Sequence, residues 1–291
     1  MGRLRKWVLG ARPPTLVAGL VPVMVGAASV GRGAVSVPRT LLALVVAMGM
    51  QVGVNYANDY FDGVRGVDTS ARLGPPRLVA SGLASPRRVA LAAVLAVVVA
   101  AAAGLWLSVL TSPLLLLVGA ASIAALVLYS GGPSPYGARG LGEVAVFLFF
   151  GMAATVGTAF VQQMRIPVAS WLAAAAVGLL ACQLLMVNNI RDISTDAAAG
   201  KRTLAVRLGD RRSRMLLIAT GATALLIPVI AAATGVMPRA AALAALAIIF
   251  AARPWQVAAK ATGRALIAAL IGLSRAELAF AVVLAVAFLA S

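Results

Sequence analysis

Long apolar runs occupy most of this chain and limit its fold more than any other feature. Hydrophobic residues make up 62% of the 291 residues and charged residues only 11%, against about 45–50% and about 25% in soluble domains. Since a transmembrane helix needs about 20 residues, this composition suffices for roughly nine spans. The runs cover residues 15–31, 39–61, 87–108, 112–129, 141–161, 168–190, 213–235, 238–252 and 272–290. The sequence therefore predicts an all-α integral membrane protein with nine transmembrane helices, and it excludes a soluble enzyme or a disordered chain.

The basic residues predict how these spans are oriented. The chain has 25 Lys and Arg, 8 Asp and Glu, and a formal net charge of +17. With a cytoplasmic N-terminus and alternating spans, 21 cations fall on the inner side and four on the outer side, the excess typical of cytoplasmic loops. Because the cations lie in short gaps between apolar runs, they fit contact with anionic membrane lipid rather than with nucleic acid. We expect a multi-pass plasma-membrane protein with its N-terminus in the cytoplasm.

The acidic residues are few, and in this topology all eight fall on the inner side or at inner helix ends. A first cluster, Asn58, Asp59, Asp62 and Asp68, closes the second run. If a helix continues to Asp62, then Asn58 and Asp62 share one of its faces. Gly63 and Gly66 are expected to break the helix and let Asp68 fold back.

A second cluster, Asn188, Asn189, Asp192 and Asp196, closes the sixth run. Its steps of three and four residues predict one helical stripe. Gly200 is expected to cap the helix, and Lys201 and Arg202 follow directly. The second and sixth runs both lead from the outer to the inner side, so we expect the two clusters to meet there.

These residue types favour one kind of chemistry. The chain has no His and a single Cys, Cys182, which excludes zinc, haem and His-based catalytic triads. Carboxylate and amide oxygens suit Mg²⁺, which binds one or two carboxylates together with phosphate oxygens and water. The sequence therefore predicts a metal–diphosphate site at the mouth of an apolar cavity. The alternative for either cluster alone is helix capping and solvated polarity at the membrane interface.

Asn58-Asp59-x-x-Asp62 with Asp68, and Asp192-x-x-x-Asp196 with Gly200, resemble the two aspartate-rich motifs of the UbiA superfamily of intramembrane aromatic prenyltransferases. Four further segments resemble the 1,4-dihydroxy-2-naphthoate polyprenyltransferase branch of menaquinone synthesis, at residues 11–16, 77–82, 129–143 and 200–209. The resemblance covers most of residues 10–210. Pro14 departs from the pattern, because a basic residue is common there.

The resemblance implies a single domain over residues 1–291, with nine helices around a central cavity open to the cytoplasmic side. It implies that one Mg²⁺ is bound by Asp62 and Asp68 and a second by Asp192 and Asp196. These four aspartates are the implied catalytic and metal-binding residues. Further candidate substrate-binding residues are Arg12, Asn58, Asp59, Tyr129, Arg139, Asn188 and Lys201.

The implied reaction transfers a polyprenyl group from polyprenyl diphosphate to 1,4-dihydroxy-2-naphthoate. Diphosphate and CO₂ are lost and demethylmenaquinol is formed. Two alternatives stay open at this point. One is another aromatic acceptor, such as 4-hydroxybenzoate, and the other is an ion-coupled transporter, which needs ionisable groups near the bilayer midplane. The sequence does not define the prenyl chain length, because that depends on the depth of the cavity.

Overall fold

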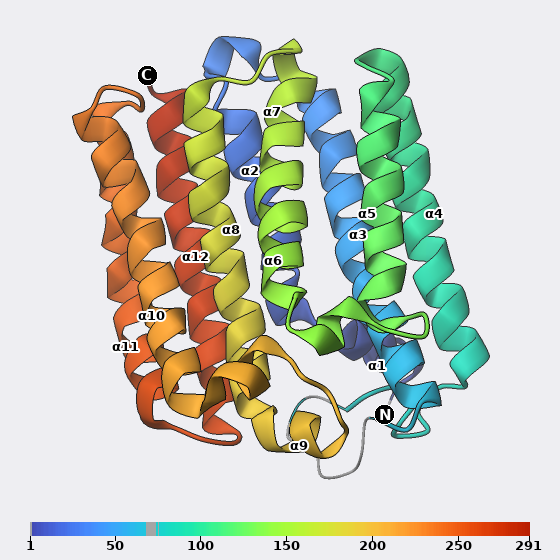
Figure 1. The fold of residues 1–291 in the computed structure, drawn as a ribbon. Coiled ribbons are helices and arrows are strands. Elements are labelled where there is room, and N and C mark those ends of the chain that lie inside the picture. Colours follow the sequence, from blue (N-terminus) through green and yellow to red (C-terminus); the bar gives the residue numbers. More distant parts are fainter. Residues whose placement is uncertain (1, 68–73, 75) are drawn as a thin grey trace.

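A computed structural model describes residues 2–67, 74 and 76–291, and every regular element in this part of the chain is a helix (Figure 1). The longer helices carry the labels α, and short 3-10 helices and one π-helical segment, η4, carry the labels η. In chain order they are α1 (Arg3–Gly10), η1 (Pro13–Thr15), α2 (Val17–Ala28), η2 (Arg32–Ala34), α3 (Val37–Val64), α4 (Pro86–Leu110), α5 (Leu114–Ser130), η3 (Tyr136–Arg139), α6 (Gly142–Val146), η4 (Phe147–Ala153), α7 (Ala154–Gln163), α8 (Val168–Arg191), α9 (Ile193–Ala198), α10 (Leu204–Ala233), η5 (Arg239–Ala247), α11 (Ile248–Lys260) and α12 (Ala265–Leu289).

Seven helical segments are long and apolar enough to cross a membrane, and two of these segments join consecutive labelled helices. They are α3, α4, α6–η4–α7, α8, α10, η5–α11 and α12. An eighth span is possible by the same measure if Leu4–Gly10 and Pro13–Ala28, which meet at an angle of 40°, cross together. The apolar helix α5 is shorter, at 17 residues. The prediction of an all-α, multi-pass membrane protein is confirmed, and the described residues provide seven clear spans rather than nine.

Two helix boundaries differ from those predicted. The segment α10 consists of two helices joined at a kink, because Gly209 takes a non-helical φ of +76° and ψ of 169°. The helix after this kink contains most of the run predicted at 213–235 and begins shortly before it. The run predicted at 272–290 begins at Ala265, so Glu277 lies midway along α12 and not at an inner helix end. There Glu277 is buried, and neither of its carboxylate oxygens has a hydrogen-bond partner among the described residues.

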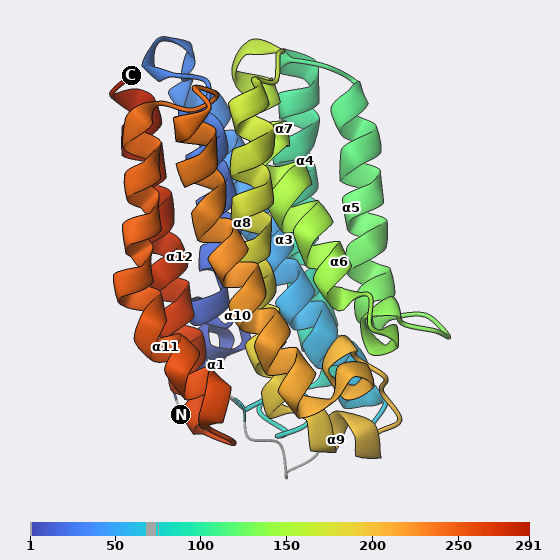
Figure 2. The ribbon, with the colours of Figure 1, turned by 60° about the vertical axis from the view of Figure 1, so that its left-hand side comes forward.

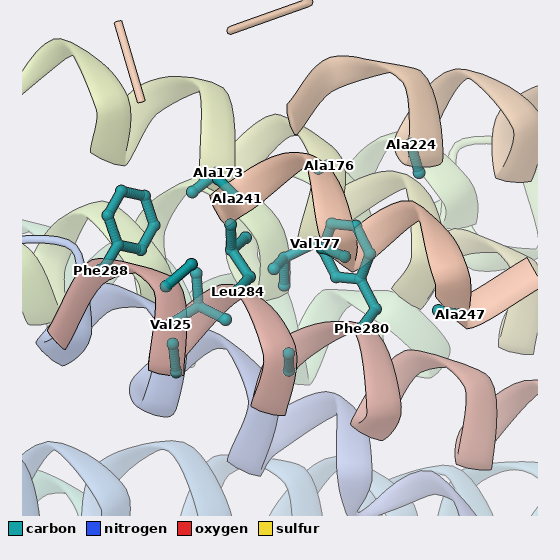
Figure 3. Packing of buried hydrophobic residues seen from close by; sticks show 14 of the residues in the cluster. Val25, Ala173, Ala176, Val177, Ala224, Ala241, Ala247, Phe280, Leu284 and Phe288 are labelled. Carbon is teal, nitrogen blue, oxygen red and sulfur yellow. The ribbon is translucent and has the colours of Figure 1, made fainter. Parts of the chain in front are cut away.

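Small residues form the core of one half of the bundle. Alanines of α8, α10, η5 and α12 pack around larger side chains such as Phe280, Leu284 and Phe288 (Figure 3). Such residues let helix backbones approach closely, which is the usual basis of helix packing in membranes. In the apolar window of α8, 72% of residues are buried, against 17% in α3. Helix α8 therefore lies at the centre of this half.

The other half consists of α3, α4 and α5, with α5 packed on α3 and α4 (Figures 1 and 2). Many large apolar side chains of α4 and α5 are exposed, as expected of surfaces that face lipid. The N-terminus lies at the same end of the bundle as α9, and the C-terminus lies at the opposite end (Figure 1). We call the end that holds α9 the polar end, because the site described next is there.

Candidate active site

A cavity of about 1010 Å³ lies between the two halves of the bundle. This volume is at the upper end of the range for small-molecule sites, about 300–1,000 Å³. Its wall along α3, α4, α5 and η4–α7 is mostly apolar. At the polar end it is lined by residues of both predicted clusters, namely Asn58, Asp59, Asp62, Asn188, Asn189, Asp192 and Asp196, and by Arg12, Tyr129 and Lys201. Segments far apart in the chain therefore meet in one site, as the sequence predicts.

Asp59 holds the segment that contains Leu78 and Val79 against the end of α3. One carboxylate oxygen accepts the backbone N–H of Leu78 at 2.8 Å and the other accepts that of Val79 at 3.0 Å. The side chain is almost completely buried, with 1% exposure. Asp59 borders the cavity, but its two oxygens are already used by the backbone. Its geometry is that of a positioning residue rather than of a substrate ligand.

The predicted helix break at Gly63 is wrong. Helix α3 continues to Val64, and Gly63 lies inside it. The side chain of Val79 packs where a Cβ atom of residue 63 would be, so this glycine allows a close contact and does not end the helix. The break occurs at Gly66, whose φ of +67° suits glycine. Asp68 lies outside the described residues, so its predicted metal-binding role stays a prediction.

Asn58 ties the first cluster to the end of α5. Its side-chain oxygen accepts a hydrogen bond from the Ser130 hydroxyl at 2.6 Å. The guanidinium of Arg65 donates to the backbone oxygen of Ser130 at 2.6 Å and to that of Gly132. These bonds fix the polar ends of α3 and α5 relative to each other.

An ion pair joins the two clusters directly. Lys201 follows the second cluster in the chain, and its Nζ lies 3.2 Å from Oδ2 of Asp62 in the first cluster. Gly200, with a φ of +74°, ends α9 as predicted and turns the chain back toward Asp62. The backbone N–H of Lys201 also donates to the backbone oxygen of Asp196 at 2.9 Å.

The second cluster does not form one helical stripe. Helix α8 ends at Arg191, and Asp192 has φ −99° and ψ 7°, so the chain bends before α9 begins. Arg191 holds Asp192 from the side, with Nε to Oδ1 and Nη2 to Oδ2 both at 2.7 Å. This bidentate pair fixes the Asp192 carboxylate at the bend, because two parallel charge-assisted hydrogen bonds are strong and geometrically specific.

Asn189 is turned toward α6. Its side-chain nitrogen donates to Oε1 of Glu143 at 2.8 Å. A carboxylate can only accept hydrogen bonds, which fixes the orientation of the Asn189 amide. Glu143 itself is buried and lies outside the cavity lining. Glu143 therefore positions Asn189 from outside the cavity.

Arg139 and Tyr129 have different surroundings. Arg139 is exposed in η3, outside the lining of the cavity, so the structure does not bring it to the other candidates. Tyr129 lines the cavity and packs edge-on against Tyr136, with ring centroids 5.4 Å apart. Burial raises the pKa of Tyr136 to about 12, so its hydroxyl stays protonated and donates to the backbone oxygen of Ala125.

Two amides of α3 hold the N-terminal segment, and one of them, Gln51, was not identified from the sequence. The side chains of Gln51 and Asn55 donate to the hydroxyl of Thr15 at 3.3 and 3.2 Å, and Asn55 also donates to the backbone oxygen of Ala11. These bonds hold the bent N-terminal segment against the cavity, where Arg12 takes a φ of +55° at the bend. The signal in the sequence was the spacing of Gln51 and Asn55, four residues apart and in line with the first cluster.

The residues fit a Mg²⁺ ion that also binds phosphate. Among the described residues, no three His, Cys, Asp or Glu side chains lie close enough together to hold a metal ion alone. Mg²⁺ does not need such a cage, since it commonly takes one or two carboxylates and completes its shell with phosphate and water. Asp62, Asp192 and Asp196 supply the carboxylates around one cavity mouth. Arg12, Arg77, Arg191 and Lys201 line the same mouth and suit a diphosphate.

The fold and the site together define a class: a helical membrane protein whose apolar cavity carries carboxylates of two helix ends at one mouth. The sequence profile of the UbiA prenyltransferase family matches residues 19–270. The chain belongs to this family.

Relatives of known name are similar over about three quarters of the chain. A 1,4-dihydroxy-2-naphthoate octaprenyltransferase of Mycobacterium tuberculosis is 50% identical over 217 residues, which are 74% of this chain and 74% of the relative. The protein of the same name from Escherichia coli is 36% identical over 221 residues, 74% of this chain and 72% of the relative.

Solved structures share the fold. A UbiA homolog from Aeropyrum pernix K1 superposes with a TM-score of 0.68 at 17% identity, covering 97% of this chain and 98% of the homolog. A UbiA homolog from Archaeoglobus fulgidus bound to DMAPP and Mg²⁺ gives a TM-score of 0.66 at 15% identity, covering 97% and 99%.

Proposed function

We propose that this protein transfers a polyprenyl group from polyprenyl diphosphate to 1,4-dihydroxy-2-naphthoate, with loss of diphosphate and CO₂, to give demethylmenaquinol. One observation carries the proposal: the carboxylates at the ends of α3 and α8 line one mouth of a large apolar cavity. The family membership and the names of the relatives support it.

The reaction follows from the two environments of the cavity. At the polar end, the allylic C–O bond of the donor breaks, and its electron pair leaves with the diphosphate. A ring carbon of the electron-rich naphthoate attacks the prenyl carbon so released. That ring carbon carries the carboxylate, and loss of CO₂ returns an electron pair to the ring. Apolar helix walls keep water from the allylic cation, which would otherwise form an alcohol.

The polar residues have separate tasks in this scheme. Asp62 and Asp68, and Asp192 and Asp196, would hold Mg²⁺. When bound, this ion neutralises the diphosphate and makes it a better leaving group. Lys201, now paired with Asp62, is placed to contact the diphosphate instead.

The aromatic acceptor needs its own contacts at the same mouth. Arg12 lines the cavity beside the first cluster and is our candidate for the naphthoate carboxylate. Tyr129 offers a ring against which the naphthoate can pack. A different acceptor, such as 4-hydroxybenzoate, would use the same donor site.

An ion-coupled transporter fits the cavity less well. Every charged residue that lines the cavity within the described chain lies at the polar end, and the remaining wall is mostly apolar. Glu277 is the buried carboxyl at mid-depth, and it does not line the cavity. Transport would need polar groups along the path of the ion.

We also propose that residues 1–291 form one prenyltransferase domain with nine spans, its polar end in the cytoplasm of a plasma-membrane protein. In this topology the bent α1–α2 segment and α5 cross in addition to the seven longer helices. The termini at opposite ends of the bundle are consistent with an odd number of crossings (Figure 1). The 21 to 4 distribution of cations supports the orientation.

Thiol labelling tests this topology, since Cys182 is the single cysteine and is buried. An impermeant thiol reagent should label Gly33→Cys in intact cells and Ala199→Cys only after permeabilisation. The reverse pattern would contradict the orientation.

Mass spectrometry of the reaction product tests the function. Purified protein with Mg²⁺, a polyprenyl diphosphate and 1,4-dihydroxy-2-naphthoate should give a prenylated quinol and one CO₂ per product. A panel with 4-hydroxybenzoate in place of the naphthoate identifies the acceptor. Prenylation of 4-hydroxybenzoate alone would overturn the choice of acceptor. Ion flux into proteoliposomes without diphosphate release would overturn the proposal that the protein is a prenyltransferase.

A further inference from the structure

Three glycines line the apolar part of the cavity, one on each of three helices: Gly104 on α4, Gly119 on α5 and Gly157 on α7. A Cβ atom at Gly119 or Gly157 would have no atom within 4 Å outside its own helix backbone and chain neighbours. At Gly104 it would meet Val46 Cγ2 at 3.7 Å, an ordinary contact. A side chain at any of the three would therefore extend into the cavity.

Helix packing does not explain these glycines. At Gly49 of α3, by contrast, a Cβ atom would lie 2.9 Å from the backbone oxygen of Ala96, so glycine is required there for α3 and α4 to meet. Gly178 of α8 likewise lies against Phe147. Glycine is less favourable than alanine inside a helix. What the three cavity glycines do provide is open space within the cavity.

The depth of two of them follows from positions along the helices. Ser130 of α5 is hydrogen-bonded to the first cluster, and Gly119 lies 11 residues from it, about 16 Å at 1.5 Å per residue. Gly104 lies beside Val46, which is 12 residues from Asn58, the partner of Ser130, along α3, about 18 Å by the same measure.

Gly157 lies slightly deeper than both. Glu143 is at the level of the second cluster, because it accepts a hydrogen bond from Asn189. Gly157 is 14 residues from Glu143, about 21 Å along the helix. Beyond all three, Val23, Leu107 and Val161 form an apolar cluster that borders the outer end of the cavity.

We propose that Gly104, Gly119 and Gly157 determine which prenyl chain lengths the protein accepts, an inference that rests on the proposed function. Each isoprene unit adds four chain carbons, about 5 Å at ordinary bond lengths. Gly119 is then level with about the third unit from the diphosphate, Gly104 lies between the third and the fourth, and Gly157 is level with about the fourth. Their missing side chains leave the path open for a chain longer than three units.

The test compares Gly119→Phe, Gly157→Phe and Gly104→Phe with donors of two, four and eight isoprene units. For Gly119→Phe, kcat/KM for the eight-unit donor should fall about tenfold or more relative to the two-unit donor, since apolar pockets discriminate strongly by size. Gly104→Phe and Gly157→Phe should likewise keep their activity with two units and lose it with eight. Gly157→Phe, at the deepest of the three positions, should keep the most activity with the four-unit donor.

The matched control is Ala121→Phe, an exposed position of α5 outside the cavity lining. It should keep the wild-type chain-length profile. Activity with the two-unit donor reports in the same assay that each variant is folded. An unchanged profile in the glycine variants, or an equal loss with every donor, would overturn the inference. Absence of product from the wild type with all donors would instead contradict the proposed function.

Discussion

The two acidic clusters look alike in the sequence but are held by different means. In the first, backbone N–H groups of Leu78 and Val79 bind Asp59, while Asp62 faces Lys201 across the cavity mouth. In the second, a neighbouring side chain, Arg191, clamps Asp192 through two hydrogen bonds. A carboxylate within an aspartate-rich motif can therefore serve the fold or the substrate. Only the contacts of each one distinguish the two roles.

The largest effect is expected where the carboxylates face the diphosphate. Asp62→Asn and Asp192→Asn should each lower kcat on the order of 100-fold or more, because each removes charge stabilisation from the leaving group. Steady-state turnover with the prenyl donor measures this. Asp210→Asn is the control, since Asp210 pairs with Arg214 on α10 outside the cavity lining, and it should turn over normally. Near wild-type kcat in Asp62→Asn would remove this residue from the site.

Asp59→Asn should mainly affect stability, which separates it from its neighbour Asp62. The amide group would present N–H toward one of the two backbone donors and leave it unsatisfied, a cost of about 1–3 kcal/mol. Thermal unfolding in detergent should show a midpoint lower by several degrees. The same measurement on Asp62→Asn should show little change. A stable Asp59→Asn with normal melting but no turnover would make Asp59 a substrate ligand after all.

Lys201 tests the link between the clusters. Lys201→Met should raise KM for the prenyl diphosphate by about tenfold, which corresponds to about 1.4 kcal/mol of lost charge interaction. Lys201→Arg keeps the charge and should recover most of the affinity. If both variants bind the donor equally well, the ion pair with Asp62 is only structural.

The smallest effect is expected at the junction of α3 and α5. Ser130→Ala removes the hydroxyl that donates to Asn58, and a neutral hydrogen bond contributes about 0.5–1.5 kcal/mol. KM for the donor should rise only a few-fold, with kcat unchanged. A loss as large as that of Asp62→Asn would mean that the hydroxyl contacts substrate directly.

Sequence reasoning predicted the parts of this molecule that depend on local pattern. Apolar runs of span length predicted the helices. The motifs at the ends of two such runs predicted that Asp62 and Asp192 line the same cavity mouth. Gly200 was identified as a helix end because a positive φ there is a local property of glycine.

Properties set by distant contacts could not be predicted in this way. Nothing near Gly63 in the sequence shows that Val79 packs where a Cβ atom of residue 63 would lie. The role of Asp59 depends on backbone groups 19 and 20 residues away. Arg139 was expected in the site because it is the single cation of its loop, but the fold of η3 leaves it exposed. Glu277 was misplaced because the start of α12 at Ala265 was ambiguous in a continuous apolar run.

The central claim is that the two clusters form one diphosphate site. Calorimetric titration of the purified protein with inorganic pyrophosphate in the presence of Mg²⁺ tests it most directly. We predict one binding site per chain, abolished in Asp62→Asn and equally in Asp192→Asn, with no further loss in the double variant. Two sites per chain, or one site retained in each single variant, would contradict the claim.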